Sequence, residues 1–137
     1  MTEPLLAPYA ARVHWQSPAP LDQRALETLL AHLLEEVARR ADAAGARLVG
    51  HIKALATFPD GGYVRGSVTS PGQAADTIGV VPGRHHQFDL TLNVLVYGLT
   101  EDEVDQIVRA AVQRRARDAG AAFVVDWPTH HLERLVP

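Results

Sequence analysis

Hydrophobic and polar residues alternate along three segments in the middle of the chain, residues 47–58, 63–70 and 87–98. A repeat of two residues predicts strands that bury one face and expose the other. The third segment has the clearest pattern. Its expected buried residues are Phe88, Leu90, Leu92, Val94 and Val96, and its expected exposed residues are Asp89, Thr91, Asn93, Leu95 and Tyr97.

The sequence PDGG at residues 59–62 joins the first two segments. This strong turn signal predicts that they form a β-hairpin. In the first strand of that hairpin, the alternation assigns Leu48 and Ile52 to the buried face. It assigns Val49 and His51 to the opposite face.

Residues 21–45 repeat with a different period. Six apolar residues recur at helical spacing and form one stripe: Leu26, Leu29, Leu30, Leu33, Val37 and Ala41. The stripe predicts an amphipathic helix, and Gly45 is a suitable residue to end it. His32 falls on the polar side of this helix, where we expect it to face solvent.

Residues 99–120 carry the signals of a second helix. Thr100 and Glu103 have the spacing of a capping box, and Leu99 and Val104 have the spacing of a hydrophobic staple. A second apolar stripe follows these residues, and a glycine at the end of the segment closes the helix.

Two shorter apolar runs complete the pattern. Residues 121–127 predict a fourth strand, and residues 11–16 predict an edge strand before the first helix. The order is then (β)-α-β-β-β-α-β. Two amphipathic helices on one face of a mainly antiparallel sheet of four to five strands give a two-layer α+β sandwich. We expect residues 1–127 to form one domain and residues 128–137 to form a tail that docks on a neighbouring subunit.

The composition narrows the class of protein. The chain has 137 residues, of which 47% are hydrophobic and 21% charged, as in an ordinary globular domain. It has no cysteine, which excludes disulfides, thiolate metal sites and cysteine nucleophiles. The net charge of −3 supplies no general attraction to nucleic acid, and no apolar run is long enough to span a membrane. We therefore expect a cytoplasmic protein that binds neither nucleic acid nor membrane.

The polar face of the sheet is the first candidate for function. It mixes aromatic, apolar and basic residues, a composition typical of a subunit interface between sheets. The candidate interface residues are His51, Tyr63, Leu95 and Tyr97, together with Trp127 at the start of the tail.

The sequence has no nucleophile elbow and no phosphate loop. These features favour a non-catalytic binding or accessory protein that self-associates. Acid–base catalysis by Lys53, His51, Tyr63 and Asp89 would require that they line a pocket.

A long loop at residues 70–86 is the second candidate. Loops of this length in compact domains are usually functional or disordered, and this one ends in three basic or titratable residues. The alternative function is therefore binding of a small anion, with possible enzymatic activity. Its candidate residues are Lys53, Arg65, Arg84, His85 and His86.

Two pairs of adjacent histidines raise the question of a metal site. The candidate ligands are His51, His86, His130 and His131, with Asp89 or Asp126 to complete the set. Adjacent histidines in a strand point to opposite faces, so each pair offers one ligand to a shared site. The pairs also lack the spacing of known zinc motifs. The sequence favours polar strand ends and predicts no cofactor, with a divalent metal as the alternative.

Overall fold

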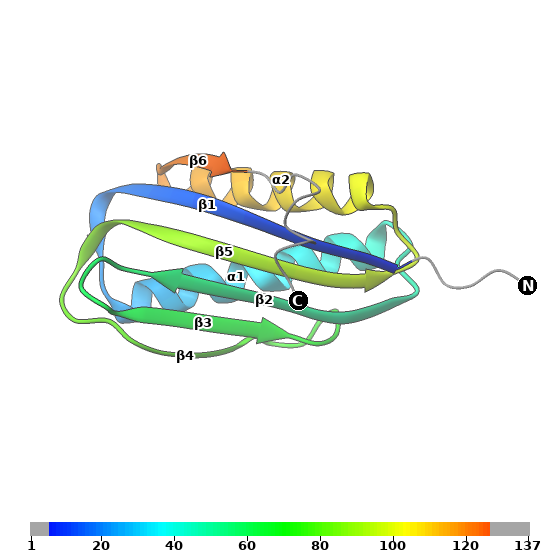
Figure 1. Ribbon diagram of the computed structural model, residues 1–137, viewed down its shortest axis with the longest axis horizontal. Helices are drawn as coiled ribbons and strands as arrows, with labels where there is room; N and C mark the ends of the chain where they lie inside the picture. Colours follow the sequence, from blue (N-terminus) through cyan, green and yellow to red (C-terminus); the bar gives the residue numbers. More distant parts are fainter. Residues whose placement is uncertain (1–5, 127–137) are drawn as a thin grey trace, which may run out of the picture.

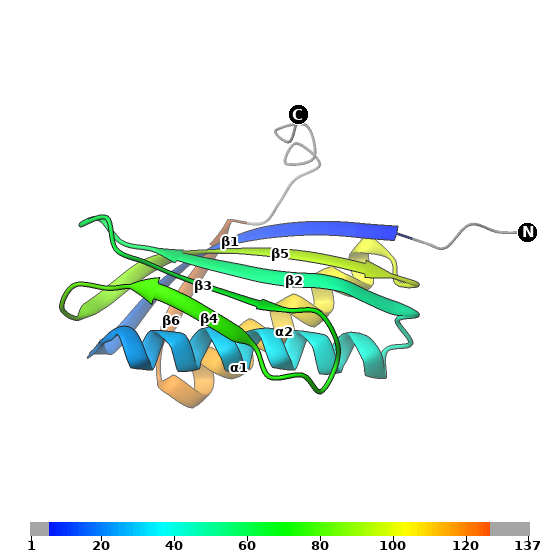
Figure 2. The same ribbon diagram turned by 90° about the horizontal axis from the view of Figure 1, so that it is seen from below.

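The computed structural model describes residues 6–126. Its elements, in chain order, are β1 (Leu6–Leu21), α1 (Gln23–Ala43), β2 (Leu48–Thr57), β3 (Tyr63–Val68), β4 (Asp76–Val80), β5 (His85–Tyr97), α2 (Glu101–Ala119) and β6 (Ala122–Asp126). The strands form one sheet in the order β4-β3-β2-β5-β1-β6, and all neighbouring strands are antiparallel (Figure 1). Both helices lie against the same face of the sheet (Figure 2). The predicted α+β class is confirmed.

The sheet has six strands rather than four or five, because the predicted loop at residues 70–86 contains β4. Side chains of α1 bind backbone groups of β4 and of the residue directly before it. The Nε2 atom of Gln23 donates a hydrogen bond to the carbonyl oxygen of Gly79 at 2.8 Å, and the N–H of Ala75 donates to a carboxylate oxygen of Glu35 at 2.9 Å. These partners lie 56 and 40 residues apart in the chain. Local sequence patterns therefore could not reveal the strand.

The first strand also differs from its prediction. Residues 11–16 were expected to form a short edge strand, but β1 spans 16 residues and lies between β5 and β6. Its side chains alternate between buried and exposed from Ala7 to Trp15. Pro8 within this run obscures the strand in the sequence, because proline is depleted in strands.

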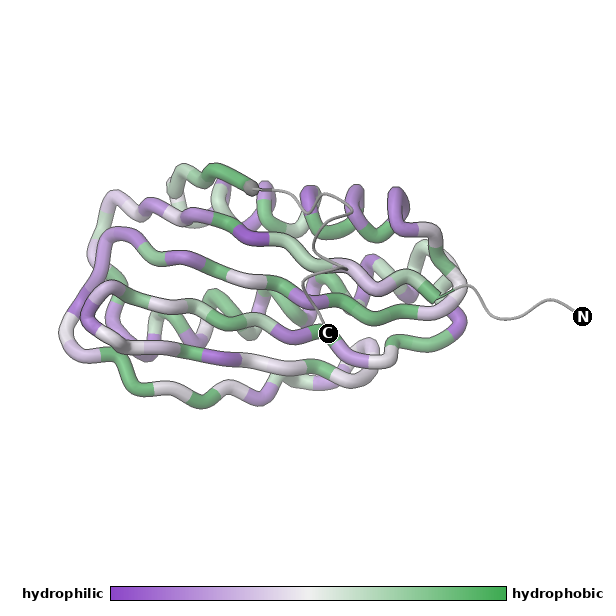
Figure 3. Tube along the Cα trace, viewed as in Figure 1, coloured by the Kyte–Doolittle hydropathy of each residue, from purple (hydrophilic) through white to green (hydrophobic). Residues whose placement is uncertain are grey.

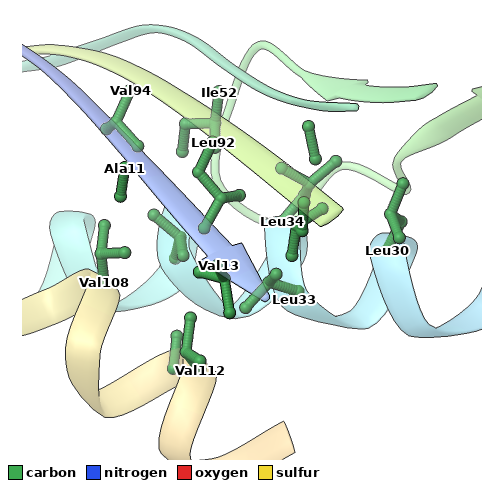
Figure 4. Close-up of a cluster of buried hydrophobic side chains, with 14 of the residues drawn as sticks. Ala11, Val13, Leu30, Leu33, Leu34, Ile52, Leu92, Val94, Val108 and Val112 are labelled. Atoms are coloured by element: carbon green, nitrogen blue, oxygen red, sulfur yellow. The ribbon is translucent and has the colours of Figure 1, made fainter. Parts of the chain in front are cut away.

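The core lies between the sheet and the two helices (Figure 4). The buried side of β5 consists of the five residues expected from the alternation. From α1, the core includes Leu30, Leu33 and also Leu34, which lies outside the predicted stripe. Trp15 is fully buried on β1, where its ring stacks against Phe88 at a centroid distance of 6.1 Å.

A β-bulge in β2 reverses the predicted faces of Leu48 and Val49. Val49 pairs with Val96 and His51 pairs with Leu95, so Gly50 is an extra residue on β2. The extra residue shifts the alternation by one position. Val49 is therefore 5% exposed and Leu48 is 59% exposed, the reverse of the prediction.

The helix ends follow the sequence signals closely. The hydroxyl of Thr100 accepts a hydrogen bond from the N–H of Glu103, and the Glu103 carboxylate accepts one from the N–H of Thr100. Gly120 takes the left-handed conformation that ends α2.

Between the helices, the buried carboxylate of Glu36 lies 2.7 Å from Arg40 and 3.2 Å from Arg115. None of the helices among residues 6–126 has the length and apolar character needed to cross a membrane.

Candidate functional site: the open face of the sheet

The helix-free face of the sheet, here called the open face, holds the exposed large hydrophobic residues of the described part of the chain. Hydrophobic and polar residues alternate along the strands (Figure 3), so every second side chain points to this face. Within the described residues, the exposed large hydrophobic side chains are Leu6, Leu48, Leu55, Ile78, Val80 and Val124. The strand register places all six on the open face. The helices contribute none of them.

Five of the apolar residues on the open face form a cluster at one end of it, where β1, β2 and β5 lie side by side. We call Leu6, Pro8, Leu48, Leu95 and Tyr97 the apolar end. Tyr97 is directly opposite Leu6 on one side and Leu48 on the other. Two residues away on β5 and on the same face, Leu95 is directly opposite Pro8. Residues opposite each other in antiparallel strands have their side chains in contact range, so the five make a continuous patch.

His51 borders the apolar end, because it lies directly opposite Leu95. Burial lowers the pKa of His51 from its ordinary value, and the positive charge of Lys53 lowers it further. The imidazole is therefore mostly neutral near pH 7. The sequence predicted His51, Leu95 and Tyr97 as interface residues. The pairing of β2 with β5 places them next to one another on the open face. The sheet places Tyr63 near the other end of the face, and Trp127 lies outside the described residues.

The open face also contains a hollow of about 630 Å³ over β2, β3 and β4, with Asn93 of β5 at its border. We define the hollow by Lys53, Leu55, Tyr63, Arg65, Ile78 and Asn93, which all line it. Leu55 and Arg65 are directly opposite each other, as are Arg65 and Ile78. Lys53 lies directly opposite Asn93. Two of the five predicted anion-binding residues, Lys53 and Arg65, therefore share one site.

The other three predicted anion-binding residues lie elsewhere. His85 packs on the ring of Phe58 at a centroid distance of 4.5 Å and lies 3.3 Å from a carboxylate oxygen of Asp60. The Nδ1 atom of His86 lies at hydrogen-bonding distance, 3.1 Å, from the carbonyl oxygen of Ser17. The two histidines thus make separate contacts. Arg84 is exposed between β4 and β5 and does not line the hollow.

The predicted metal ligands that lie within the described residues do not converge either. Among residues 6–126, no group of three or more His, Asp or Glu side chains is placed to hold a metal ion. His51 and His86 have the separate surroundings described above. His130 and His131 lie outside the described residues, as does the side chain of Asp126.

An ion pair that was not predicted from the sequence lies on the open face between β1 and β5, toward the end opposite the apolar end. The Nδ1 atom of His14 is 2.9 Å from the Asp89 carboxylate, and its Nε2 atom is 3.2 Å from the Gln87 amide oxygen. The hydrogen bond to Asp89 raises the pKa of His14, partly opposed by burial and aided by Gln87. The two residues are 75 positions apart, so only the register of β1 with β5 could reveal the pair.

The His14–Asp89 pair resembles the arrangement of a proton-transfer site, but its surroundings differ. The side chains of His14 and Asp89 are 40% and 60% exposed. Water therefore solvates both groups, and the pair lacks the water-excluded pocket that favours catalysis. The proposed acid–base group of Lys53, His51, Tyr63 and Asp89 is also divided, because Asp89 pairs with His14 while Lys53 and Tyr63 line the hollow.

The comparisons with known proteins show a similar fold. No family model and no curated protein sequence matches the chain. Among solved structures, the chain is similar to the crystal structure of a hydantoinase/carbamoylase family amidase from Burkholderia ambifaria, with a TM-score of 0.51 and 13% sequence identity. The match covers 92% of this chain but 28% of the amidase. At this identity the likeness shows the fold alone: this chain has a fold similar to that of one part of the amidase.

Proposed function

We propose that this protein is a non-catalytic binding or accessory protein that associates with a second copy of itself through the apolar end. The observation that carries this proposal is that, within residues 6–126, all the exposed large hydrophobic side chains lie on the open face. Contiguous exposed apolar residues are typical of protein interaction surfaces. The amidase likeness spans 28% of that enzyme at 13% identity, so we infer no amidase activity from it.

A second copy of the chain is the partner that best fits the apolar end. Two copies related by a two-fold axis bring the same patch together, so charges of one sign on the patch would face charges of the same sign near the axis. The five residues of the apolar end include no Asp, Glu, Lys or Arg, and burial lowers the pKa of the bordering His51, which is therefore mostly neutral near pH 7. Two copies can therefore meet there without like-charge repulsion. The hollow carries Lys53 and Arg65 and is less suited to self-pairing.

Substitution of exposed leucines by aspartate tests the proposal. We expect Leu48→Asp and Leu95→Asp to weaken self-association at least about tenfold, because each change removes apolar contact and buries a charge. The measurement is sedimentation equilibrium over a range of protein concentrations. Circular dichroism melting checks that each variant still folds.

Val80→Asp is the matched control on the same face. Val80 is 62% exposed, close to the 59% of Leu48, but it lies on β4, outside the apolar end. We expect Val80→Asp to leave the association constant unchanged. A wild-type protein that stays monomeric at high concentration would contradict the proposal. Equal weakening by Val80→Asp would show instead that the interface is elsewhere on the face.

A further inference from the structure

The hollow on the open face combines two cations with apolar walls. Lys53 is directly opposite Ser67, and Leu55 is directly opposite Arg65, so Lys53 and Arg65 are diagonal neighbours on adjacent strands. Diagonal neighbours in antiparallel strands lie about 7–8 Å apart, a distance that long side chains bridge easily. The ammonium and guanidinium groups can therefore both reach one anion between them.

These two cations have no counter-ion in the described part of the chain. Neither Lys53 nor Arg65 forms an ion pair there. Asp76 also lines the hollow and lies diagonal to Arg65, yet it makes no ion pair with it. Neighbouring like charges repel each other, and an anion bound between them would relieve that repulsion.

The remaining walls of the hollow are apolar or neutral. Leu55 and Ile78 flank Arg65 and are 40% and 55% exposed. Tyr63 and Asn93 add an aromatic surface and an amide that can form hydrogen bonds. The volume of about 630 Å³ is within the range of small-molecule sites. The hollow therefore offers a charged contact and an adjoining hydrocarbon contact for the same ligand.

We propose that the hollow binds a small monovalent organic anion, a carboxylate with a short apolar body. The carboxylate would lie between Lys53 and Arg65, where Arg favours its planar geometry, and the hydrocarbon would cover Leu55 and Ile78. Asp76 favours a monovalent ligand, because its carboxylate repels a second negative charge. The site is distinct from the apolar end, so this inference does not depend on self-association.

Binding of hexanoate, followed by chemical-shift changes in the ¹⁵N NMR spectrum and by calorimetry, tests the inference. We expect one site per chain with a dissociation constant on the order of 1 mM, and saturable shifts at Lys53, Leu55, Arg65 and Ile78. Hexanamide has the same body without the charge and should bind at least about tenfold more weakly. Acetate, which lacks the hydrocarbon, and inorganic phosphate should also bind more weakly than hexanoate.

Matched variants separate the site from general positive charge. The double variant Lys53→Gln with Arg65→Gln should weaken hexanoate binding at least about tenfold. Arg12→Gln removes another exposed arginine, which is on the open face but does not line the hollow, and should leave binding unchanged. The charge variants alter exposed side chains, so we expect all of them to fold.

Several outcomes would overturn the inference. These are the absence of saturable hexanoate shifts, equal weakening by Arg12→Gln, and phosphate binding as tight as hexanoate binding. Repeating the titration in Leu48→Asp keeps the two proposals separate. Hexanoate binding that persists in this variant supports the hollow regardless of whether the wild-type protein self-associates. Hexanoate binding that disappears in the variant would contradict an independent site.

Discussion

Leu92 and Leu55 lie on neighbouring strands of one sheet, yet the first is fully buried and the second is 40% exposed. Leu92 points to the face that the helices cover, and Leu55 points to the open face. On the covered face, apolar side chains are removed from water when the chain folds, so they stabilise the fold. On the open face, apolar side chains stay in contact with water until a ligand or partner covers them. The same residue type thus contributes to stability on one face and to binding on the other.

Truncation of the two leucines tests this difference between the faces, with the largest effect that we expect. We expect Leu92→Ala to lower the free energy of unfolding by about 2–5 kcal/mol, because it removes buried surface and leaves a cavity. Leu55→Ala should change the same free energy by less than about 0.5 kcal/mol, as exposed substitutions usually do. Urea unfolding of both variants measures the difference. Equal losses would mean that the open face is covered in the folded protein.

Gly79 on β4 tests how tightly the edge strand is held to the sheet. A Cβ atom at this position would clash with the carbonyl oxygen of Tyr63 and lie 2.8 Å from the Cα atom of Val64. Both contacts are with backbone of β3, which cannot move aside easily. We therefore expect Gly79→Ala to lower the free energy of unfolding by about 1–3 kcal/mol. Gly72→Ala is a useful comparison in hydrogen-exchange measurements, because Gly72 lies outside the strands: its φ of 77° would strain an alanine, but the added Cβ would clash with no atom. Faster amide exchange in β4 of Gly79→Ala but not of Gly72→Ala would support the clash.

An effect smaller than that of Gly79→Ala is expected from the pH dependence of His14 on the open face. The hydrogen bond to Asp89 raises the pKa of His14 above its ordinary value of 6.5 in the folded protein. Protonated His14 therefore favours folding. This stabilisation is complete below the ordinary pKa and disappears as the pH rises through the folded-state pKa. Because both side chains are well exposed, the effect should be below about 1 kcal/mol.

His14→Gln removes the titrating group and should flatten this part of the pH profile. Thermal unfolding of both proteins between about pH 5.5 and pH 8.5 measures the difference. A wild-type profile that matches the His14→Gln profile would show that the ion pair does not contribute to folding.

The elements with strong local signals were predictable from the sequence. The capping residues Thr100 and Glu103 and the alternation in residues 87–98 depend on neighbours within a few positions, and both predictions are confirmed. The bulge at Gly50 was not predictable, because it appears only when β2 is aligned with β5. β4 was missed for a similar reason: backbone groups at this strand bind side chains of α1 that are distant in the sequence.

The candidate sites were also predictable only in part, because the exposed positions were predicted but their neighbours were not. Alternation alone placed Lys53, Arg65, Leu95 and Tyr97 on the exposed side of their strands. It could not tell which of them are neighbours, because cross-strand contacts depend on register. Arg84 was grouped with Lys53 and Arg65 on charge alone, but it does not line the hollow. The His14–Asp89 pair went unnoticed because its partners are on strands 75 residues apart.

Local sequence patterns were sufficient to predict the α+β class, the two amphipathic helices with their ends, and the polarity of most strand positions. These properties arise from interactions between residues a few positions apart, which a periodic pattern records directly. The tertiary structure alone decided the strand order, the bulge in β2, the edge strand β4 and the grouping of residues into an apolar end and a hollow. Those features depend on which distant strands pair and in what register, and a shift of one residue reverses the face of every side chain that follows.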